Sequence, residues 1–559
     1  MSKVFLLIKT YLRQQYRLAD SSKKGKTILV IVILALCMTP MVVMLFISFM
    51  GSGAMARQNN VVTEMLTFLI LTTQMLVLIL GIAHLLNVIY LSKDTERLLA
   101  LPVKPNTIFI SKLTYVYLQE AVSNLGISLI VLLPFGIGAG VAWWYYPQML
   151  LVALIAPMLP LLLASIISIP LMWLVSFFKN KGLVTTIVYL LVFVLFMGGY
   201  YYFVFKINVG GEIGEDMISA LFLRLSQYAK YIFPDFMLAK SLTAASFGEY
   251  ALGLFSSLGI NFALGALSMF ISSAVYCKSV SKQLETPKDI IKIKEGKEYS
   301  KRGKVRALLS VDFKYMLRDT MAGFSMGMGI IMSPLLIVLM LFGMSQGGGE
   351  GFDLSQLIGE AGQTLMDIIG LGVAVGLMGF MSITANIVST SSFSREGKNI
   401  SLYKTLPMGS RDLLKSKMVF AFIFIGIQTA TAVVACAFVF KMSLLASIAT
   451  AVILMGVLYA SSNVEMYTDL SKPRLNWSTF TEASKNSPAQ LVGMGVGFAV
   501  MAVYGGIAIA MGIWYATARQ DYIIYLCALA MLIITAIYVY ITHYLLIKNY
   551  NKLFDRIGE

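Results

Sequence analysis

The stretch LPVKPNTIFISK (residues 101–112) has a counterpart, LPMGSRDLLKSK (residues 406–417), that starts 305 residues later (406 minus 101). Both stretches begin with Leu-Pro and end with Ser-Lys. The same offset carries Lys9 onto Lys314 and Arg13 onto Arg318, so a second pair of landmarks repeats in one register. Agreement at two places indicates a duplication of about half the chain, which decides the architecture.

The composition is that of a membrane protein. Of the 559 residues, 58% are hydrophobic and 13% charged, with a mean hydropathy of +0.79. So much apolar surface cannot be buried in a water-soluble core and requires lipid. A helix needs about 20 apolar residues to cross the hydrocarbon layer, and twelve stretches satisfy this. They are residues 27–50, 61–91, 113–138, 150–177, 182–205, 250–276, 321–344, 365–390, 418–440, 444–466, 491–515 and 522–546. The predicted fold is an all-α polytopic membrane protein with two parallel six-helix repeats.

The distribution of basic residues predicts the orientation. The chain has 44 Lys and Arg and a net charge of +16. If the N-terminus is cytoplasmic and the loops alternate, most of these residues fall in cytoplasmic loops, as the positive-inside rule requires. Both termini are then cytoplasmic. The basic run that joins the two halves is a solvated connector on this reading, and nucleic-acid binding is not expected.

Six spans per half is an even number, so each half enters and leaves on the same side, and the halves are parallel repeats. The predicted domains are a first half at 1–280, a cytoplasmic connector at 281–305 and a second half at 306–559. Each half begins with a helix that has one basic and one apolar face, at 4–19 and at 307–319. We expect these amphipathic elbow helices to lie along the inner membrane surface.

The segments after spans two and eight, 92–102 and 394–407, differ from ordinary loops. Each is first charged, then apolar, then turns at a proline and continues as a helix. A cytoplasmic helix with an apolar stripe needs a surface to dock against. The alternative is a loop helix that lies on the lipid headgroups.

These landmarks resemble those of the permease subunits of ABC-2-type exporters, in the large bacterial form that fuses two six-span halves. In that family this segment is a coupling helix, which contacts the ATPase. It runs from the charged residues through Leu-Pro to the lysine at the start of span three. The resemblance assigns this docking role to Asp94, Glu96, Arg97, Leu101, Pro102, Lys104, Lys112, Arg395, Glu396, Leu406, Pro407, Arg411 and Lys417.

The stretch DLSKPRLNW (469–477) is similar to a cytoplasmic signature loop of the same permeases. The residues that carry this similarity are Asp469, Pro473, Arg474 and Trp477. The first half departs from the pattern, because only FKNK (178–181) stands at the matching place.

No nucleotide site is expected in this chain. A P-loop requires GxxxxGK followed by Ser or Thr, and the nearest approach, GKT at 25–27, has Asp20 in place of the leading glycine. The resemblance implies that ATP and Mg²⁺ bind to separate ATP-binding-cassette ATPase subunits, in two copies, and that this chain has no cofactor and no catalytic residues. It also implies the bacterial cytoplasmic membrane as the location of a multi-pass protein.

Acids within the spans are candidates for function, because an ionisable group in hydrocarbon costs about 2.5 to 3.5 kcal/mol. Glu64 and Asp367 lie near the outer ends of spans two and eight, where they could line the translocation path or simply meet interfacial water. Glu120 and Glu465 lie near inner ends, and we expect them to pair with Lys or Arg. The two histidines, His84 and His543, have no companion carboxylate motif for a metal.

The sequence and its resemblance together predict the membrane subunit of an ATP-driven exporter. Spans with few internal charges favour an amphiphilic or hydrophobic substrate. The alternative is an ion-coupled secondary transporter of six plus six spans, which would share the parallel symmetry.

Overall fold

The computed structural model describes residues 3–15, 45–86, 105–175, 233–244, 247–272, 303–319, 322–327, 354–406, 409–477, 480–484 and 487–557, with isolated residues between these ranges. The chain divides into two compact units. The first takes most of the chain up to Lys292, and the second contains Ile293–Glu559. Every regular element among the described residues is a helix, which confirms the predicted all-α fold.

Eight helices within the described residues are long and apolar enough to cross a membrane. They are Asn106–Ala139, Tyr145–Leu171, Gly248–Ile271, Gly362–Thr384, Arg411–Phe438, Leu444–Ser471, Pro488–Ala518 and Ile523–Asp555. A shorter apolar helix, Val62–Met75, lies in the predicted span 61–91. The predicted spans 27–50, 182–205 and 321–344 lie largely outside the described residues.

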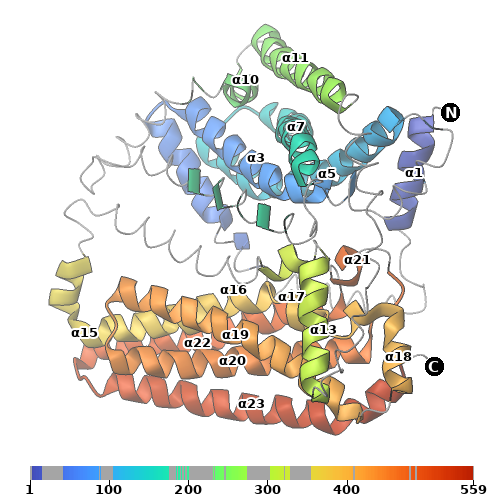
Figure 1. Cartoon of the computed structure of the whole chain (residues 1–559). Helices are drawn as coiled ribbons and strands as arrows, with labels where there is room; N and C mark the ends of the chain where they lie inside the picture. The colour runs from blue at the N-terminus through green and yellow to red at the C-terminus, as the bar shows by residue number, and fades with distance from the viewer. Residues whose placement is uncertain are drawn as a thin grey trace. The chain divides into compact units, whose positions relative to one another are not determined.

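Figure 1 shows the helices of the first unit. They pack around a core of aliphatic and aromatic side chains. Its elements are α1 (Lys3–Gln15), α3 (Val62–Leu86), α5 (Pro105–Ala139), α6 (Tyr145–Ile155), α7 (Met158–Val175), α10 (Phe233–Leu242) and α11 (Phe247–Ile271). Leu66, Phe135 and Tyr145 are fully buried there. The hydroxyl of Tyr145 donates to the carbonyl of Leu132 at 2.9 Å, so its polar atom is satisfied within the core.

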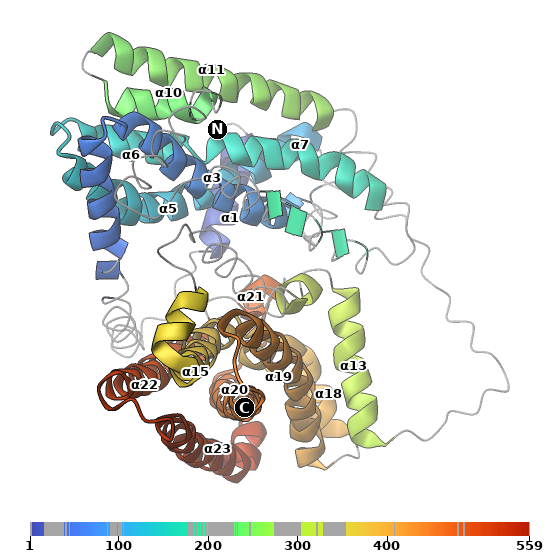
Figure 2. The same cartoon turned by 90° about the vertical axis from the view of Figure 1, so that its left-hand side faces the viewer.

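The second unit surrounds one helix with four others. Its elements are α13 (Lys304–Arg318), α15 (Leu354–Gly372), η4 (Val373–Met378), α16 (Gly379–Thr384), α17 (Ile387–Thr390), η5 (Ser394–Asn399), α18 (Ile400–Thr405), α19 (Ser410–Phe440), α20 (Leu444–Ser471), α21 (Phe480–Ser484), α22 (Pro488–Ala518) and α23 (Ile523–Asp555). Figure 2 shows α20 in the middle, with α15, α19, α22 and α23 around it, and all four contact it. This arrangement explains why α20 buries polar residues as well as apolar ones.

The same helix pairing occurs in both units. In the first unit α1 packs on α5, and in the second α13 packs on α19. Helices α5 and α19 begin at Pro105 and Ser410, which are 305 residues apart (410 minus 105). In each unit the amphipathic helix therefore lies against the helix that follows the Leu-Pro dipeptide.

Small residues let the helices of the second unit approach closely. A Cβ atom added at Gly372 would overlap the side chain of Ala508 on α22, and one added at Gly376 would lie 3.2 Å from the backbone nitrogen of Gly505. By contrast, a Cβ atom added at Gly495, on α22 itself, would have no neighbour within 4 Å.

We expect Gly372→Ala to destabilise the second unit by about 1 to 3 kcal/mol, because the added methyl group forces α15 and α22 apart. Gly495→Ala is the matched control and should be neutral or stabilising by up to about 1 kcal/mol, the difference in helix propensity. Thermal unfolding of the detergent-purified variants measures both. Equal melting temperatures for the two variants would contradict the close contact.

Candidate functional site

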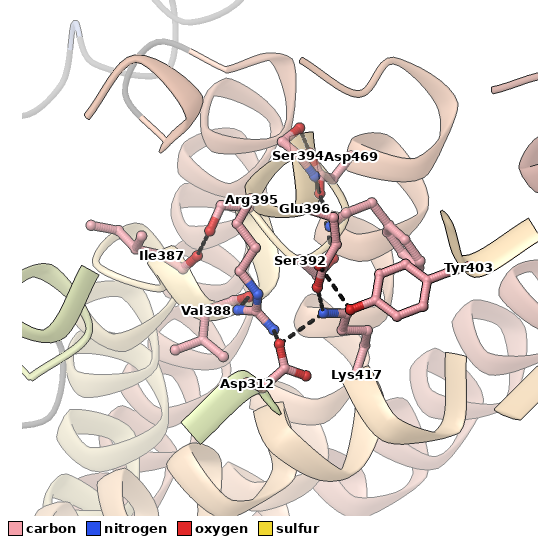
Figure 3. A network of polar contacts seen from close by, with 12 residues as sticks. Asp312, Ile387, Val388, Ser392, Ser394, Arg395, Glu396, Tyr403, Lys417 and Asp469 are labelled. Atoms are coloured by element: carbon pink, nitrogen blue, oxygen red, sulfur yellow. Dashed lines mark hydrogen bonds and ion pairs between the residues drawn. The ribbon is translucent and has the colours of Figure 1, made fainter. Parts of the chain in front are cut away.

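Four charged side chains, three of them buried and one partly buried, meet in the second unit and connect three of its elements (Figure 3). Asp312 lies on α13, Arg395 and Glu396 lie on η5, and Lys417 lies on α19. The Asp312 carboxylate is 3.0 Å from Arg395 Nη2 and 2.8 Å from Lys417 Nζ. Lys417 also pairs closely with Glu396. We call these four residues the charge network.

The charge network is electrically balanced, with two carboxylates and two cations. Asp312, Arg395 and Lys417 are each at most 4% exposed, so none can rely on water for solvation. A buried charge is tolerated when it is paired and hydrogen-bonded. Burial raises the pKa of Asp312, but Arg395 and Lys417 outweigh it and hold the pKa below its usual range. Asp312 is therefore a carboxylate at neutral pH.

Further contacts fix each member in place. Arg395 Nη1 donates to the carbonyl of Val388 at 3.2 Å, and its guanidinium lies 4.9 Å from the centre of the Phe420 ring on α19. The Tyr403 hydroxyl donates to Glu396 at 3.1 Å. Burial, together with the nearby Glu396 carboxylate, raises the pKa of Tyr403, so this hydroxyl keeps its proton and remains a donor.

Asp469, near the end of α20, organises the backbone just before the charge network. It accepts hydrogen bonds from the backbone amides of Phe393, at 2.6 Å, and Ser394, at 3.0 Å. It also accepts from the hydroxyl of Ser394 and, at 3.4 Å, from that of Ser392. One carboxylate thus satisfies the amides at the start of η5 and ties α20 to it.

The chain that follows α20 closes over η5. The backbone amide of Arg474 donates to Ser394 Oγ at 2.9 Å, and Trp477 Nε1 donates to the Ser394 carbonyl at 2.8 Å. The Trp477 ring lies over Gly397, whose φ of 56° falls in the left-handed region that favours glycine. An added Cβ at Gly397 would lie 3.1 Å from Trp477 Nε1, so this contact also needs glycine.

Residues 28–548, nearly the whole chain, match the model of a family described as membrane proteins of 12 transmembrane segments. The chain belongs to this 12-span family. Neither a curated protein nor a solved structure is significantly similar to it. The family match confirms the predicted number of spans and a multi-pass membrane protein.

The structure of this 12-span protein brings together two sets of residues that the sequence presented separately. Arg395, Glu396 and Lys417 came from the segment after span eight, whereas Asp469, Arg474 and Trp477 came from the loop after span ten. Both sets converge on η5. Pro473, in the same loop, is partly buried between Lys472 and Arg474.

The remaining docking candidates differ in position. Asp94, Glu96, Arg97, Leu101, Pro102, Lys104 and Pro407 lie outside the described residues. Lys112, the counterpart of Lys417, is fully buried and donates to the carbonyl of Val88 at 2.8 Å. Leu406, just after α18, and Arg411, in the first turn of α19, are exposed.

The two acids proposed for the translocation path have different surroundings. Asp367 is 4% exposed and accepts hydrogen bonds from the backbone amide and hydroxyl of Ser443, at 2.8 and 2.6 Å, and from Gln363 at 3.2 Å. These bonds anchor the start of α20. Glu64 is partly exposed in the first turn of α3. Their part in a translocation path stays a prediction.

The expected partners of two other acids were wrong. Glu120 pairs with His84, Oε1 to Nδ1, at 3.0 Å, so this histidine does have a companion carboxylate. Glu465 is fully buried and accepts from the side chain of Asn386 at 2.9 Å. The error has a physical cause: α3 packs against α5, and α17, which Asn386 caps, packs against α20, so cross-helix partners replaced the expected basic residues. Within the described residues no group of three or more His, Cys, Asp or Glu could hold a metal ion.

The sequence analysis missed Asp312, the acid on which the charge network depends. A signal was present, because Asp312 lies four residues after Leu308 and four before Met316, on the apolar stripe of the amphipathic helix. A carboxylate on such a stripe requires a buried cation, which only the fold could identify. The corresponding residue of the first half is Leu7 (312 minus 305), so the repeat register gave no warning.

We expect Asp312→Asn to destabilise the second unit by about 3 to 5 kcal/mol, because it leaves Arg395 and Lys417 buried with one carboxylate between them. The control is Asp555→Asn, which removes the same charge from an exposed position on α23. The melting temperatures of the purified variants give the result. A melting temperature of Asp312→Asn that equals that of the control would contradict the charge network.

The stability that Asp312 contributes should also depend on pH. Because its pKa is lower in the folded protein than the ordinary value of 3.8, the contribution is complete above that value and is lost as pH falls through the folded pKa. The difference in melting temperature between wild type and Asp312→Asn should therefore stay constant above about pH 5 and shrink below about pH 4. A difference that grows as pH falls would reverse the assigned sign.

Proposed function

We propose that this chain is the membrane-spanning subunit of an ATP-driven exporter. A separate ATPase docks on the segment around α18 and on its counterpart in the first half, and an amphiphilic or hydrophobic substrate moves outward. The observation that carries the proposal is the charge network, because it joins the segment that resembles a coupling helix to an elbow helix and a membrane span.

A coupling element must transmit force instead of bending. The segment before α18 is held by the ion pair of Arg395 to α13, by that of Glu396 to α19, and by Asp469 to α20. The far end of α18 is held as well, because Lys404 Nζ donates to the carbonyls of Asp555 and Ile557 at the end of α23, at 2.9 and 2.6 Å. A push on α18 would therefore reach three spans at once.

Helix α18 also offers a surface for a partner. Leu402 is 58% exposed and Leu406, just after the helix, is 40% exposed. Apolar side chains that stand out from a rigidly held cytoplasmic helix match the docking surface that the resemblance implies. Ile400, on the opposite side, is buried in the core of the second unit, so the helix has one face for the unit and another that is open.

The duplication supports a twofold partner. Two parallel halves would present two equivalent segments on one side of the membrane, which suits an ATPase dimer. Lys112 and Lys417, which are equivalent in the repeat, are both buried. ATP and Mg²⁺ would bind in the partner, since the sequence has no P-loop. Closure of the ATPase would push both segments and rock the two helical bundles.

We place this protein in the bacterial cytoplasmic membrane, with both termini in the cytoplasm. This placement rests on the positive-inside distribution of Lys and Arg and on the resemblance.

We expect Leu402→Asp/Leu406→Asp to weaken ATPase binding at least tenfold, because two apolar contacts are each worth about 1.5 kcal/mol or more. These exposed residues are better probes than Glu396, whose charge reversal would disturb Lys417 inside the unit. The tagged chain is co-expressed with P-loop ATPases from the same genome, beginning with any that a neighbouring gene encodes. Two quantities are measured: the amount of ATPase that copurifies with the tagged chain, and the ATP-dependent uptake of a fluorescent amphiphile into inside-out vesicles.

The control is Tyr231→Asp, the same kind of change at a residue that is 84% exposed. Tyr231 lies between the predicted spans 182–205 and 250–276, which a cytoplasmic N-terminus and alternating loops would place outside the cell. It should retain wild-type binding and uptake. Two results would overturn the proposal: ATP hydrolysis by the purified chain alone, or uptake driven by an ion gradient in vesicles without the ATPase. The second result would identify an ion-coupled secondary transporter.

A further inference from the structure

The second unit contains a cavity of about 650 Å³ that the proposed function does not use. It lies between the start of α13 and the facing surfaces of α19, α20 and α23. The residues that matter for its chemistry are Arg411, Lys415, Met418, Phe422, Tyr459 and His543. All of them belong to this one unit.

One end of the cavity is basic. Arg411 and Lys415 are one helical turn apart on α19, and both are exposed. Neither forms an ion pair or a side-chain hydrogen bond within the part of the chain that the structure describes. Two adjacent cations at the mouth of an apolar cavity fit an anionic group.

The rest of the cavity is apolar. Met418, Val419 and Phe422 line it along α19, and Ile547 lines it from α23. The two polar groups that face it, Tyr459 and His543, bind each other, hydroxyl to Nδ1, at 3.0 Å. From Arg411 to Phe422 the helix rises about 16 Å, roughly half of the ~30 Å hydrocarbon layer. The lining thus spans about one leaflet from its charged edge.

The basic end faces the cytoplasmic leaflet. Lys548, Lys552 and Arg556 follow Ile547 along the last turns of α23, and Lys304 stands beside Val305 at the start of α13. Such a concentration of positive charge marks the cytoplasmic end of a bundle. The cytoplasmic leaflet is also the one whose surface is anionic.

We propose that this cavity binds an anionic phospholipid of the cytoplasmic leaflet. Arg411 and Lys415 hold the phosphate, and one acyl chain lies along Met418, Val419 and Phe422. Basic pockets between membrane helices on the cytoplasmic side are suited to such headgroups. The site belongs to the second half alone, because the positions that correspond to Arg411 and Lys415 in the first half hold Asn106 and Ile110.

The test is native mass spectrometry of the full detergent-purified chain, titrated with phosphatidylglycerol or with phosphatidylcholine of the same acyl chains. Wild type should bind phosphatidylglycerol preferentially. Arg411→Gln/Lys415→Gln should bind it about thirtyfold more weakly, equivalent to about 2 kcal/mol. The control, Lys552→Gln/Arg556→Gln, removes the same charges from exposed positions of α23 outside the cavity and should bind as wild type does.

A second variant tests the acyl chain. Val419→Trp fills the cavity without changing charge and should also weaken phosphatidylglycerol binding at least tenfold. This second variant keeps the test valid if the charge variant fails to fold. Glycerol phosphate, which has no acyl chain, should not compete at concentrations that saturate with the lipid. The proposal fails if phosphatidylcholine binds equally well, if the control variant loses binding to the same extent, or if glycerol phosphate displaces the lipid.

Discussion

Lys417 lies between two carboxylates, Asp312 and Glu396, and the packing of α13, η5 and α19 depends on this contact. A lysine ammonium that is 2% exposed would be strongly unfavourable without such partners. The requirement for two acids brings an elbow helix and the segment before α18 onto the same membrane helix. Ion pairs thereby hold α13, η5 and α19 together, although α13 is more than 70 residues before the other two (394 minus 318).

Around this contact the structure adds a second constraint, the carboxylate of Asp469. It holds the backbone at the start of η5, so that Arg395 and Glu396 point toward Asp312 and Lys417 (Figure 3). Trp477 then covers Gly397 from the other side. The ion pairs and the Asp469 hydrogen bonds join side chains and backbone of different elements, so they hold α13, α19, α20 and η5 together. The exposed side chains of α18 therefore project from a segment that these contacts hold in place.

The two halves of the chain share a plan but differ in detail. In both halves an amphipathic helix packs against the helix that follows Leu-Pro. The lysine near the start of that second helix, Lys112 or Lys417, is buried. Yet Asp312, Arg411 and Lys415 are replaced by Leu7, Asn106 and Ile110 in the first half. Asp312 and the two cations of the cavity therefore occur in the second half and have no charged counterpart at the matching positions of the first.

The amino-acid sequence by itself determined the helical class, the number of spans and the repeat, because hydrophobic length and a fixed offset are local properties that can be counted along the chain. It also identified Arg395, Glu396, Lys417 and Asp469 as individual residues. Only the tertiary structure decided which of them meet. Asp312 gained its role from packing between α13 and α19, and Glu120 gained His84 from packing between α3 and α5. A buried charge pairs with a residue that folding brings close to it. The spatial distance between two such residues cannot be read from their positions in the sequence.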